Sequence, residues 1–366
     1  MPAQAKRRLH WFCSLPTPYN HFLFSKIANT GEFDLLVHFR TLTRSSHPWK
    51  GLPQAEFLWR RCGRTGWMDL GALRPAFSEE ESYFVLGGWS DPWMCAVLWI
   101  RMIRGFPFAV WTDGPDTRLR PGWKHFLRSR WLALVFLKAD KVFVTSRSGV
   151  EPLRRLGCPP EKIVVFPYWV RLPPVPLPAR SSSTAVRFFG LGRLEPLKQY
   201  DLAISAMKLL IEQLGPAAAR LTLSGDGSQV AKLKQLAQDF RVDGCVTLAG
   251  WQEHAEAMLL LEESDVFVHP AQWEPYGVGI LEAMARGKPV IASRATLAAA
   301  DRVRHGINGF LFETGDAGAL AECMGRFVRE PQLILRMGRE ARKTSEEWPV
   351  EKGLETLRRT AARRIA

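Results

Sequence analysis

Two glutamates, Glu274 and Glu282, stand eight residues apart in the stretch EPYGVGILEAMARGKPVIAS, which begins after an apolar run, DVFVHP, and three further residues. Three backbone amides that could face a ligand lie between them, those of Gly277, Val278 and Gly279. Amides at the start of a helix favour an anion or sugar oxygens, and a carboxylate can accept hydrogen bonds from two hydroxyls at once. The pattern suits a ligand with hydroxyls on both sides of phosphates, such as a nucleotide sugar. The alternative is a capped helix with surface glutamates.

A second loop, FFGLGRLEPLKQYDLAISA, places two cations where an apolar run ends. Gly190 and Gly192 close the run, Arg193 follows, and Lys198 opens a helical pattern. Glycines let a ligand approach the backbone closely, and cations beside a helix N-terminus suit a diphosphate. A tight turn with solvated cations is the alternative, because short glycine patterns are common.

Both loops would have to lie at the ends of strands, and the pattern of the sequence predicts a fold that places them there. Short apolar runs alternate with amphipathic helical patterns on either side of a Pro- and Ser-rich segment. This alternation predicts βαβ units and parallel sheets, in which ligands bind beyond the carboxyl ends of the strands. We therefore predict an α/β protein with two doubly wound, Rossmann-like domains facing an interdomain cleft. The expected parts are an N-terminal domain over 1–170, a linker over 171–184, a C-terminal domain over 185–348, and a helix over 349–366 that could pack back on the N-terminal domain.

The predicted strands are the short apolar runs. They are residues 9–14, 33–39, 83–88, 106–111, 141–146 and 162–167 in the first half, and 185–192, 220–225, 245–250, 265–270, 288–293 and 309–313 in the second. Helical patterns such as KQYDLAISAMKLLIEQLG at 198–215 separate them.

Composition narrows the class of protein. The chain has 366 residues, 46% hydrophobic and 23% charged, which favours two folded cores over one. Its six cysteines are scattered without paired spacing, which argues against a disulfide framework or zinc site and suits a reducing cytosol. We expect no secretory signal, because the start MPAQAKRRLHWFCSLPTP lacks a long apolar run. We also expect no membrane span, because arginines, glycine and proline interrupt the most apolar segment, 92–111.

The positive charge is uneven. Of the net +14, residues 1–170 contribute +11, from 24 Lys and Arg against 13 Asp and Glu, which suggests an anionic partner. The segment 117–140 mixes cations with aromatic residues, and positions 123, 127, 131 and 134 fall on one helical side. This pattern fits a helix in an anionic membrane interface, or a sheet-covering helix with a solvated basic side. We do not expect a nucleic-acid partner, since no recognition motif is present.

The sequence resembles the retaining glycosyltransferases of the GT-B fold, family 4 (glycosyl transferases group 1). FGLGRLEPLKQYDLAISA, LTLSGDG, EPYGVGILEAMARGKPVIAS and HGINGFLFETGD carry the resemblance, and KADKVFVTS and LRRLGCPPEKIVVFP extend it more loosely into the first half. The resemblance implies sugar transfer with retention from a UDP- or GDP-type nucleotide-sugar donor to a saccharide or lipid-linked acceptor, with no metal or other cofactor. It also implies cell-surface polysaccharide or glycolipid biosynthesis, in the cytoplasm or peripherally on the inner face of the membrane.

Two other functions stay open. One is a nucleotide-sugar epimerase or hydrolase of the same fold, which would convert donor without an acceptor. The other is a non-catalytic protein that binds nucleotide sugar or membrane.

The resemblance also implies roles for residues of the two loops. Arg193 and Lys198, beside Gly192, would hold the donor diphosphate and take up charge as it leaves. Glu274 would contact sugar hydroxyls and Glu282 the ribose diol. The backbone contacts to sugar and phosphate would come from Gly277, Val278 and Gly279. The expected catalytic residues are therefore Glu274, Arg193 and Lys198.

The N-terminal half departs from the family pattern. Many members carry a histidine where this chain has FAVWTDGPD; Asp113 there could orient the sugar, receive a proton or cap a turn. SLPTPYNHF replaces the family's N-terminal glycine loop, and there Thr17, Asn20 and His21 would either border the acceptor or serve packing. The remaining candidates for acceptor-side or membrane contact are Trp123, Lys124 and Arg128.

Overall fold

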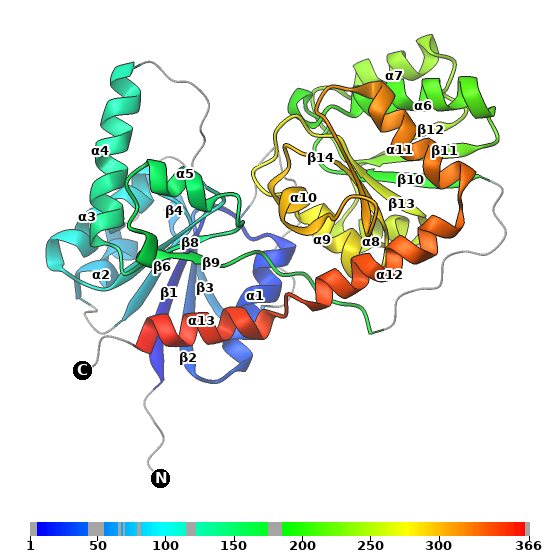
Figure 1. Cartoon of the computed structure of the whole chain (residues 1–366). Helices are drawn as coiled ribbons and strands as arrows, with labels where there is room; N and C mark the ends of the chain where they lie inside the picture. Colours follow the sequence, from blue (N-terminus) through cyan, green and yellow to red (C-terminus); the bar gives the residue numbers. More distant parts are fainter. Residues whose placement is uncertain are drawn as a thin grey trace. The chain divides into compact units, whose positions relative to one another are not determined.

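The computed structural model describes residues 6–42, 55–64, 67–68, 70–78, 82–114, 122–174 and 185–362. The chain forms two compact units, one of Met1–Trp169 with Val350–Ala366 and one of Val170–Pro349. Each unit is a parallel sheet flanked by helices (Figure 1). The chain thus leaves the first unit, builds the second, and returns to the first with its last helix.

The first unit holds a seven-stranded parallel sheet in the order β3-β2-β1-β6-β7-β8-β9. Its strands are β1 (Arg7–Cys13), β2 (Phe33–Phe39), β3 (Leu58–Arg61), β6 (Tyr83–Leu86), β7 (Phe108–Thr112), β8 (Lys141–Val144) and β9 (Ile163–Val165), with a small antiparallel pair, β4 (Gly63–Arg64) and β5 (Trp67–Met68). Its helices are α1 (Pro18–Asn29), α2 (Leu70–Ser78), α3 (Pro92–Arg104), α4 (Gly122–Lys138), α5 (Val150–Arg155), the 3-10 turn η1 (Pro160–Lys162) and α13 (Val350–Ala362).

The inner strands of this sheet are mostly apolar because both faces are covered. In β6, Tyr83 and Val85 belong to a core shared with α1 and α13, whereas Phe84 and Leu86 belong to a core shared with α3 and α4. Every residue of β6 is therefore buried, although successive side chains point to opposite faces.

Caps fix the ends of α3. The Asp91 side chain accepts a hydrogen bond from Trp93 N at 2.9 Å, and Pro92 opens the first turn. Gly105 ends the helix at φ 68°, a left-handed conformation that glycine adopts without strain.

The second unit holds a six-stranded parallel sheet in the order β12-β11-β10-β13-β14-β15. Its strands are β10 (Val186–Leu191), β11 (Ala219–Ser224), β12 (Val246–Gly250), β13 (Val266–His269), β14 (Val290–Ser293) and β15 (Gly309–Phe312). Its helices are the 3-10 turn η2 (Pro196–Lys198), α6 (Tyr200–Leu214), α7 (Val230–Asp239), α8 (His254–Glu263), α9 (Val278–Ala285), α10 (Leu297–Arg302), α11 (Ala317–Arg329) and α12 (Gln332–Glu346).

These sheets confirm the predicted α/β class with two Rossmann-like sheets. No helix in the described parts of the chain is long and apolar enough to cross a membrane. The structure differs from the expectation at an edge strand and at the start of a helix. The edge strand β3 was not predicted, because LWRR is too exposed to form an apolar run. The helix expected over 198–215 is split, since Gln199 adopts φ 50° between η2 and α6. Most of the expected linker, 175–184, lies outside the described residues.

Candidate functional site

The order of strands in the second sheet reverses between β10 and β13, so the connections leave in opposite directions from these neighbours. Ligands of doubly wound sheets bind at such a point, beyond the carboxyl ends of the strands. The predicted donor residues lie there, in the loops after β10 and β13 and on α9: Gly192, Arg193, Lys198, Glu274, Gly277, Val278, Gly279 and Glu282.

Main-chain contacts hold the loop after β10 in place. Gly192 N donates to Ser224 O at 3.0 Å, and Gln272 N, from the loop after β13, donates to Leu197 O at 2.9 Å. A Cβ atom at Gly225, directly after β11, would overlap the carbonyl of Gly192. Only glycine therefore lets the loops after β10 and β11 approach so closely. The two loops that carry the predicted site are thereby tied together through the backbone.

A buried ion pair joins these loops. Lys198 Nζ contacts Glu274 Oε2, and each side chain is only 13% exposed. Burial, and then the positive charge of Arg193, lowers the pKa of Lys198 to about 8. The structure thus brings three predicted residues together, with two cations against one carboxylate, and this arrangement favours an additional anion.

His269, the last residue of β13, lies next to Glu274 of this pair. Its Nε2 is 3.4 Å from Glu274 Oε2, and neither ring nitrogen has a hydrogen-bond partner among the described residues. Burial, and then the charge of Lys198, lowers the pKa of His269 to about 3. The imidazole is therefore neutral at physiological pH and adds no charge to the site.

The N-terminus of α9 faces the same loop. Gly277 is its N-cap residue at φ 99°, and a Cβ there would lie 2.7 Å from Thr296 Cγ2 and 3.4 Å from Glu274 Cγ. At Gly279 a Cβ would lie 3.1 Å from the ring of Phe267. Both glycines therefore allow close packing at a helix start whose free amides favour a negative group.

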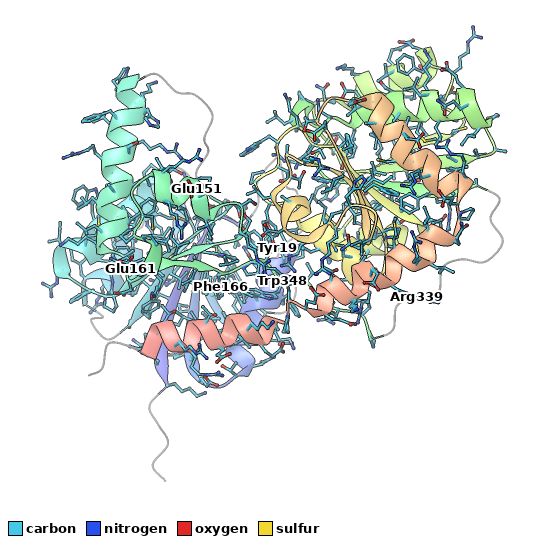
Figure 2. The ribbon with its side chains drawn as sticks, in the orientation of Figure 1. Tyr19, Glu151, Glu161, Phe166, Arg339 and Trp348 are labelled. Carbon is cyan, nitrogen blue, oxygen red and sulfur yellow. The ribbon has the colours of Figure 1, made fainter. Side chains whose placement is uncertain are left out.

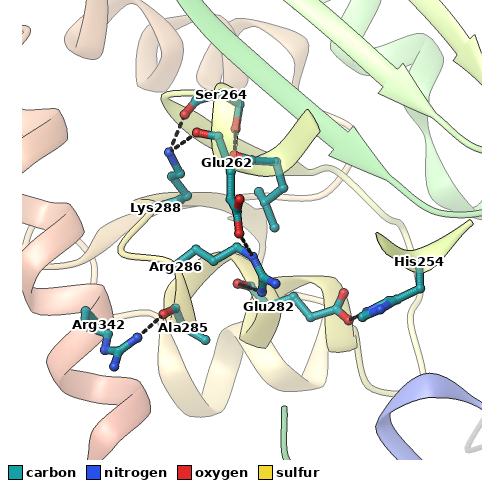
Figure 3. A network of polar contacts seen from close by, with 9 residues as sticks. His254, Glu262, Ser264, Glu282, Ala285, Arg286, Lys288 and Arg342 are labelled. Atoms are coloured by element: carbon teal, nitrogen blue, oxygen red, sulfur yellow. Dashed lines mark hydrogen bonds and ion pairs between the residues drawn. The ribbon is translucent and has the colours of Figure 1, made fainter. Parts of the chain in front are cut away.

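Glu282 lies in the second turn of α9 and is buried. Its Oε1 is 2.6 Å from Nε2 of His254, the first residue of α8, as Figure 3 shows. The neighbouring Arg286 bonds to the Glu262 carboxylate at 3.1 Å and reaches Glu282 only through its carbonyl oxygen, at 3.3 Å. One oxygen of the Glu282 carboxylate is thus held by the half-exposed side chain of His254.

Cations hold the C-terminal end of α9 (Figure 3). Arg342 Nη1 donates to Ala285 O at 2.6 Å. Lys288 Nζ donates to Glu262 O at 2.8 Å and to Ser264 O at 2.7 Å. Ala285 is the last residue of α9, whereas Glu262 and Ser264 lie at the end of α8, so Arg342 satisfies a carbonyl of α9 and Lys288, which follows α9, satisfies two carbonyls of α8.

Asp113 follows β7 in the first unit and is hydrogen-bonded within it. Thr145 Oγ1 donates to Asp113 Oδ1 at 3.2 Å, and the Tyr168 hydroxyl also donates to this carboxylate. Burial raises the pKa of Asp113, and these two bonds oppose the rise. Tyr168 in turn meets Tyr19 of α1, which Figure 2 labels, with ring centroids 4.7 Å apart.

The other candidates of the first unit lie on two different helices, α1 and α4. Thr17 caps α1, since Asn20 N donates to its Oγ1 at 3.2 Å. The Asn20 side chain is buried and its Oδ1 has no partner among the described residues, whereas His21 packs against Phe57. On α4, Trp123 and Lys124 are exposed and Arg128 is half-exposed.

The four residues expected along one side of α4 differ in their exposure. Trp123 and Leu127 are exposed as expected, but Trp131 and Leu134 are half-buried and Phe126 joins the exposed set. Trp131 turns toward α3, where it packs on Trp99.

Sequence reasoning missed the two histidines that lie next to the predicted glutamates. His269 ends the apolar run VFVH, and His254 opens the pattern HAEAMLLLEE. A histidine at the carboxyl end of a strand is a usable signal, because that position faces the site in doubly wound sheets. Nothing local marks His254, whose partner Glu282 is 28 residues away.

Both halves of the chain match families of known proteins. Residues 180–344 match Glycosyl transferases group 1, and residues 37–169 match Glycosyl transferase 4-like domain. The chain is a GT-B protein that resembles the family 4 glycosyltransferases. HepE of Anabaena, solved in complex with UDP, superimposes with a TM-score of 0.75 at 18% identity, over 97% of this chain and 99% of that one.

Curated relatives of this GT-B chain align over a part of their length. The amylovoran biosynthesis glycosyltransferase AmsK of Erwinia amylovora is 30% identical over 52% of this chain and 48% of its own. The lipopolysaccharide core biosynthesis glycosyltransferase LpsE of Rhizobium meliloti is 32% identical over 42% of this chain and 43% of its own. The match thus spans about half the length of these relatives.

Proposed function

We propose that this chain is a glycosyltransferase that moves a sugar from a nucleoside-diphosphate sugar to a saccharide or lipid-linked acceptor. The observation that carries the proposal is the buried Lys198–Glu274 pair beside Arg193, at the switch point of the second sheet. The names of AmsK and LpsE, both glycosyltransferases of bacterial polysaccharide or lipopolysaccharide biosynthesis, support it.

The diphosphate, the ribose and the transferred sugar of the donor each have a matching group in the proposal. Lys198 and Arg193 bind the diphosphate together with the amides at the start of α9. Glu282 accepts hydrogen bonds from the ribose hydroxyls, and His254 orients its carboxylate. Glu274 exchanges its contact with Lys198 for sugar hydroxyls when the diphosphate takes the cation. The donor is of the UDP or GDP type.

The proposed reaction retains configuration at the anomeric carbon. The bond from this carbon to the diphosphate oxygen breaks, and the acceptor hydroxyl oxygen bonds to the same face of the carbon. The acceptor proton passes to an oxygen of the departing diphosphate, so atoms and charge balance. Lys198 and Arg193 stabilise the negative charge that develops on the leaving group, and in this proposal they serve in place of a metal ion.

We place this reaction in cell-surface polysaccharide or glycolipid assembly, on the cytoplasmic side of a membrane with which the protein associates peripherally. The relatives' names and the excess of positive charge in residues 1–170 support this placement.

The test is nucleotide binding followed by turnover. UDP or GDP should raise the melting temperature, and Lys198→Ala should weaken binding roughly 10- to 100-fold through loss of a charged hydrogen bond. Lys232→Ala is the matched control, because it removes another lysine paired with a carboxylate, at an exposed site. Glu282→Gln should lose more affinity for UDP than for 2′-deoxyuridine diphosphate if its carboxylate binds the 2′-hydroxyl.

The outcomes separate the rival functions. Donor consumption that requires an added acceptor supports transfer, whereas equal consumption without acceptor supports an epimerase or hydrolase. If folded protein shows no shift with UDP, GDP or ADP, the proposal fails.

A further inference from the structure

One buried polar side chain beside the donor site, that of His269, has no part in the proposed reaction. Only 3% of this residue is exposed, and neither ring nitrogen has a hydrogen-bond partner among the described residues. Buried polar groups are almost always hydrogen-bonded, because an unmade bond loses the hydration of the group and gains nothing in return. The two unpaired nitrogens of His269 therefore require a physical reason.

The fold holds this ring in a fixed place at the carboxyl end of β13. Phe267 stands two residues earlier on the same side of the strand, and its ring stacks with that of His269, with centroids 6.2 Å apart and planes at 16°. A Cβ atom at Gly279 would lie 3.1 Å from the Phe267 ring, so the start of α9 packs on this stack. The main chain of His269 pairs with Ala292 of β14. The imidazole is therefore firmly placed on the side of the sheet that α9 covers.

Two side chains from different elements converge on one oxygen atom of Glu274. Lys198, at the end of η2, contacts Oε2 of this glutamate, and His269 Nε2 lies 3.4 Å from the same atom. That distance is beyond the roughly 2.7–3.2 Å of a good N–H···O hydrogen bond. A lysine cation bonds to a carboxylate more strongly than a neutral imidazole does, so Glu274 turns to Lys198. This competition explains why the ring of His269 is unpaired.

A bound diphosphate would end this competition. The inference rests on the proposed function, in which Lys198 leaves Glu274 for the diphosphate of the donor. The Glu274 side chain is only 13% exposed, and a buried carboxylate that loses its partner is costly. His269 lies close enough to replace the lysine. Because burial, and then the charge of Lys198, lowers the pKa of His269 to about 3, its ring is neutral and offers a hydrogen-bond donor without a charge.

We propose that His269 is a positioning residue that takes over Oε2 of Glu274 when the donor diphosphate withdraws Lys198. In this arrangement Nε2–H of the imidazole donates to Oε2, and Oε1 of the same carboxylate stays available to the hydroxyls of the transferred sugar. His269 touches no atom of the donor and acts through Glu274 alone. Occupation of the diphosphate position thus turns Glu274 from the partner of Lys198 into a firmly held acceptor for the sugar.

The first test observes the ring of His269 directly, by NMR of the full chain carrying isotope-labelled histidine. Addition of UDP or GDP, with inorganic pyrophosphate as a probe for the diphosphate alone, should move one ring N–H proton downfield and slow its exchange with solvent, because a hydrogen bond to a carboxylate forms. The same signal should be present without any ligand in Lys198→Met, where the lysine no longer competes. It should be missing in His269→Phe and remain in His125→Gln, which changes an exposed histidine of α4.

The second test separates recognition of the sugar from recognition of the diphosphate. Isothermal titration calorimetry compares UDP and GDP with UDP-glucose, UDP-galactose, UDP-N-acetylglucosamine and GDP-mannose. His269→Phe should bind the bare diphosphates within about twofold of the wild type but lose about tenfold in affinity for the best nucleotide sugar, which is the contribution of one hydrogen bond to a charged group. His269→Gln, whose amide N–H can reach the position of Nε2, should recover most of this affinity.

Two further comparisons exclude a merely structural role. Phenylalanine can keep the stack on Phe267 and removes two buried unpaired nitrogens, so the melting temperature of His269→Phe should stay the same or rise. Because His269 acts through Glu274, Glu274→Gln should show the same loss of sugar affinity, and the double variant should lose no more than either single variant.

The inference is overturned, with the sugar transfer intact, if UDP binds but the ring N–H signal appears neither in its complex nor in Lys198→Met. It is overturned as well if His269→Phe weakens bare diphosphates and nucleotide sugars equally, or if the losses of His269→Phe and Glu274→Gln add. The same holds if no nucleotide sugar binds the wild type more tightly than its diphosphate, since Glu274 then holds no sugar. If the folded wild type binds none of UDP, GDP and pyrophosphate, the proposed function fails and this inference fails with it.

Discussion

The residue that best characterises the candidate site is Lys198. A buried lysine is costly unless a partner compensates for the lost hydration, and Glu274 is that partner. Arg193 adds a second positive charge that Glu274 alone does not neutralise, and this lowers the pKa of Lys198 further. A strongly perturbed pKa with a specific charge partner is typical of a functional site.

The pKa of Lys198 leads to a pH dependence. Its ordinary value is 10.5 and its value in the folded chain is about 8, so the charge that attracts a diphosphate is present below pH 8 and is lost above it. We expect the UDP affinity to fall by up to about tenfold per pH unit above 8. Isothermal titration calorimetry between pH 7 and 9.5 measures this directly.

Lys198→Arg is the matched control for that profile. A guanidinium keeps its charge throughout this range, so the affinity of the variant should not change with pH. A wild-type affinity that stays constant to pH 9.5 would contradict a role for Lys198 in diphosphate binding.

At the scale of elements, the sequence predicted what local pattern determines. Strands such as β6 and β13 were predicted because a strand buried on both faces is a continuous apolar run. The edge strand β3 was missed because its residues are mostly exposed. The loops around Lys198 and Glu274 were predicted from their glycines and charges, but their ion pair depends on contacts between β10 and β13.

The elements also explain why parts of the site escaped prediction. The contact of His254 with Glu282 joins α8 to α9, and no periodicity links these positions. The sequence predicted one apolar side of α4 at positions 123, 127, 131 and 134, but only the packing of Trp131 on Trp99 shows that Trp131 is half-buried.

Gly277 tests whether the start of α9 is part of the site. Gly277→Ala places a Cβ 2.7 Å from Thr296 Cγ2 at a residue with φ 99°, so we expect a loss of about 1–3 kcal/mol in the free energy of unfolding. The displaced helix start should also weaken UDP binding. Urea unfolding and thermal shift measure the two effects.

Gly306→Ala is the control for backbone strain, since Gly306 has φ 79° but open space around its Cβ position. It should lower stability by less and leave the UDP shift intact. Equal UDP binding by wild type and Gly277→Ala would show that α9 does not contact the donor.

At the scale of the whole molecule, the first unit is completed by the last helix. The first 169 residues and α13 share a core, in which Val350, Leu357 and Ala361 are buried. Gly353 packs directly on the Trp169 ring, which leaves no room there for a side chain. Arg358 also binds Glu32 at 2.6 Å. Helix α13 therefore contributes to the stability of the first unit although the entire second unit separates them in sequence.

Leu357→Ala should consequently destabilise the first unit alone. Removing a fully buried leucine costs about 2–5 kcal/mol, so hydrogen exchange should accelerate in β1 and β6 while strands of the second unit keep their protection. Leu333→Ala, an equally buried leucine on α12, should give the reverse pattern. UDP binding should survive Leu357→Ala, because every proposed donor contact lies in the second unit. Faster exchange in both units for each variant would instead mean that the two cores unfold as one, and α13 would then stabilise the donor site as well.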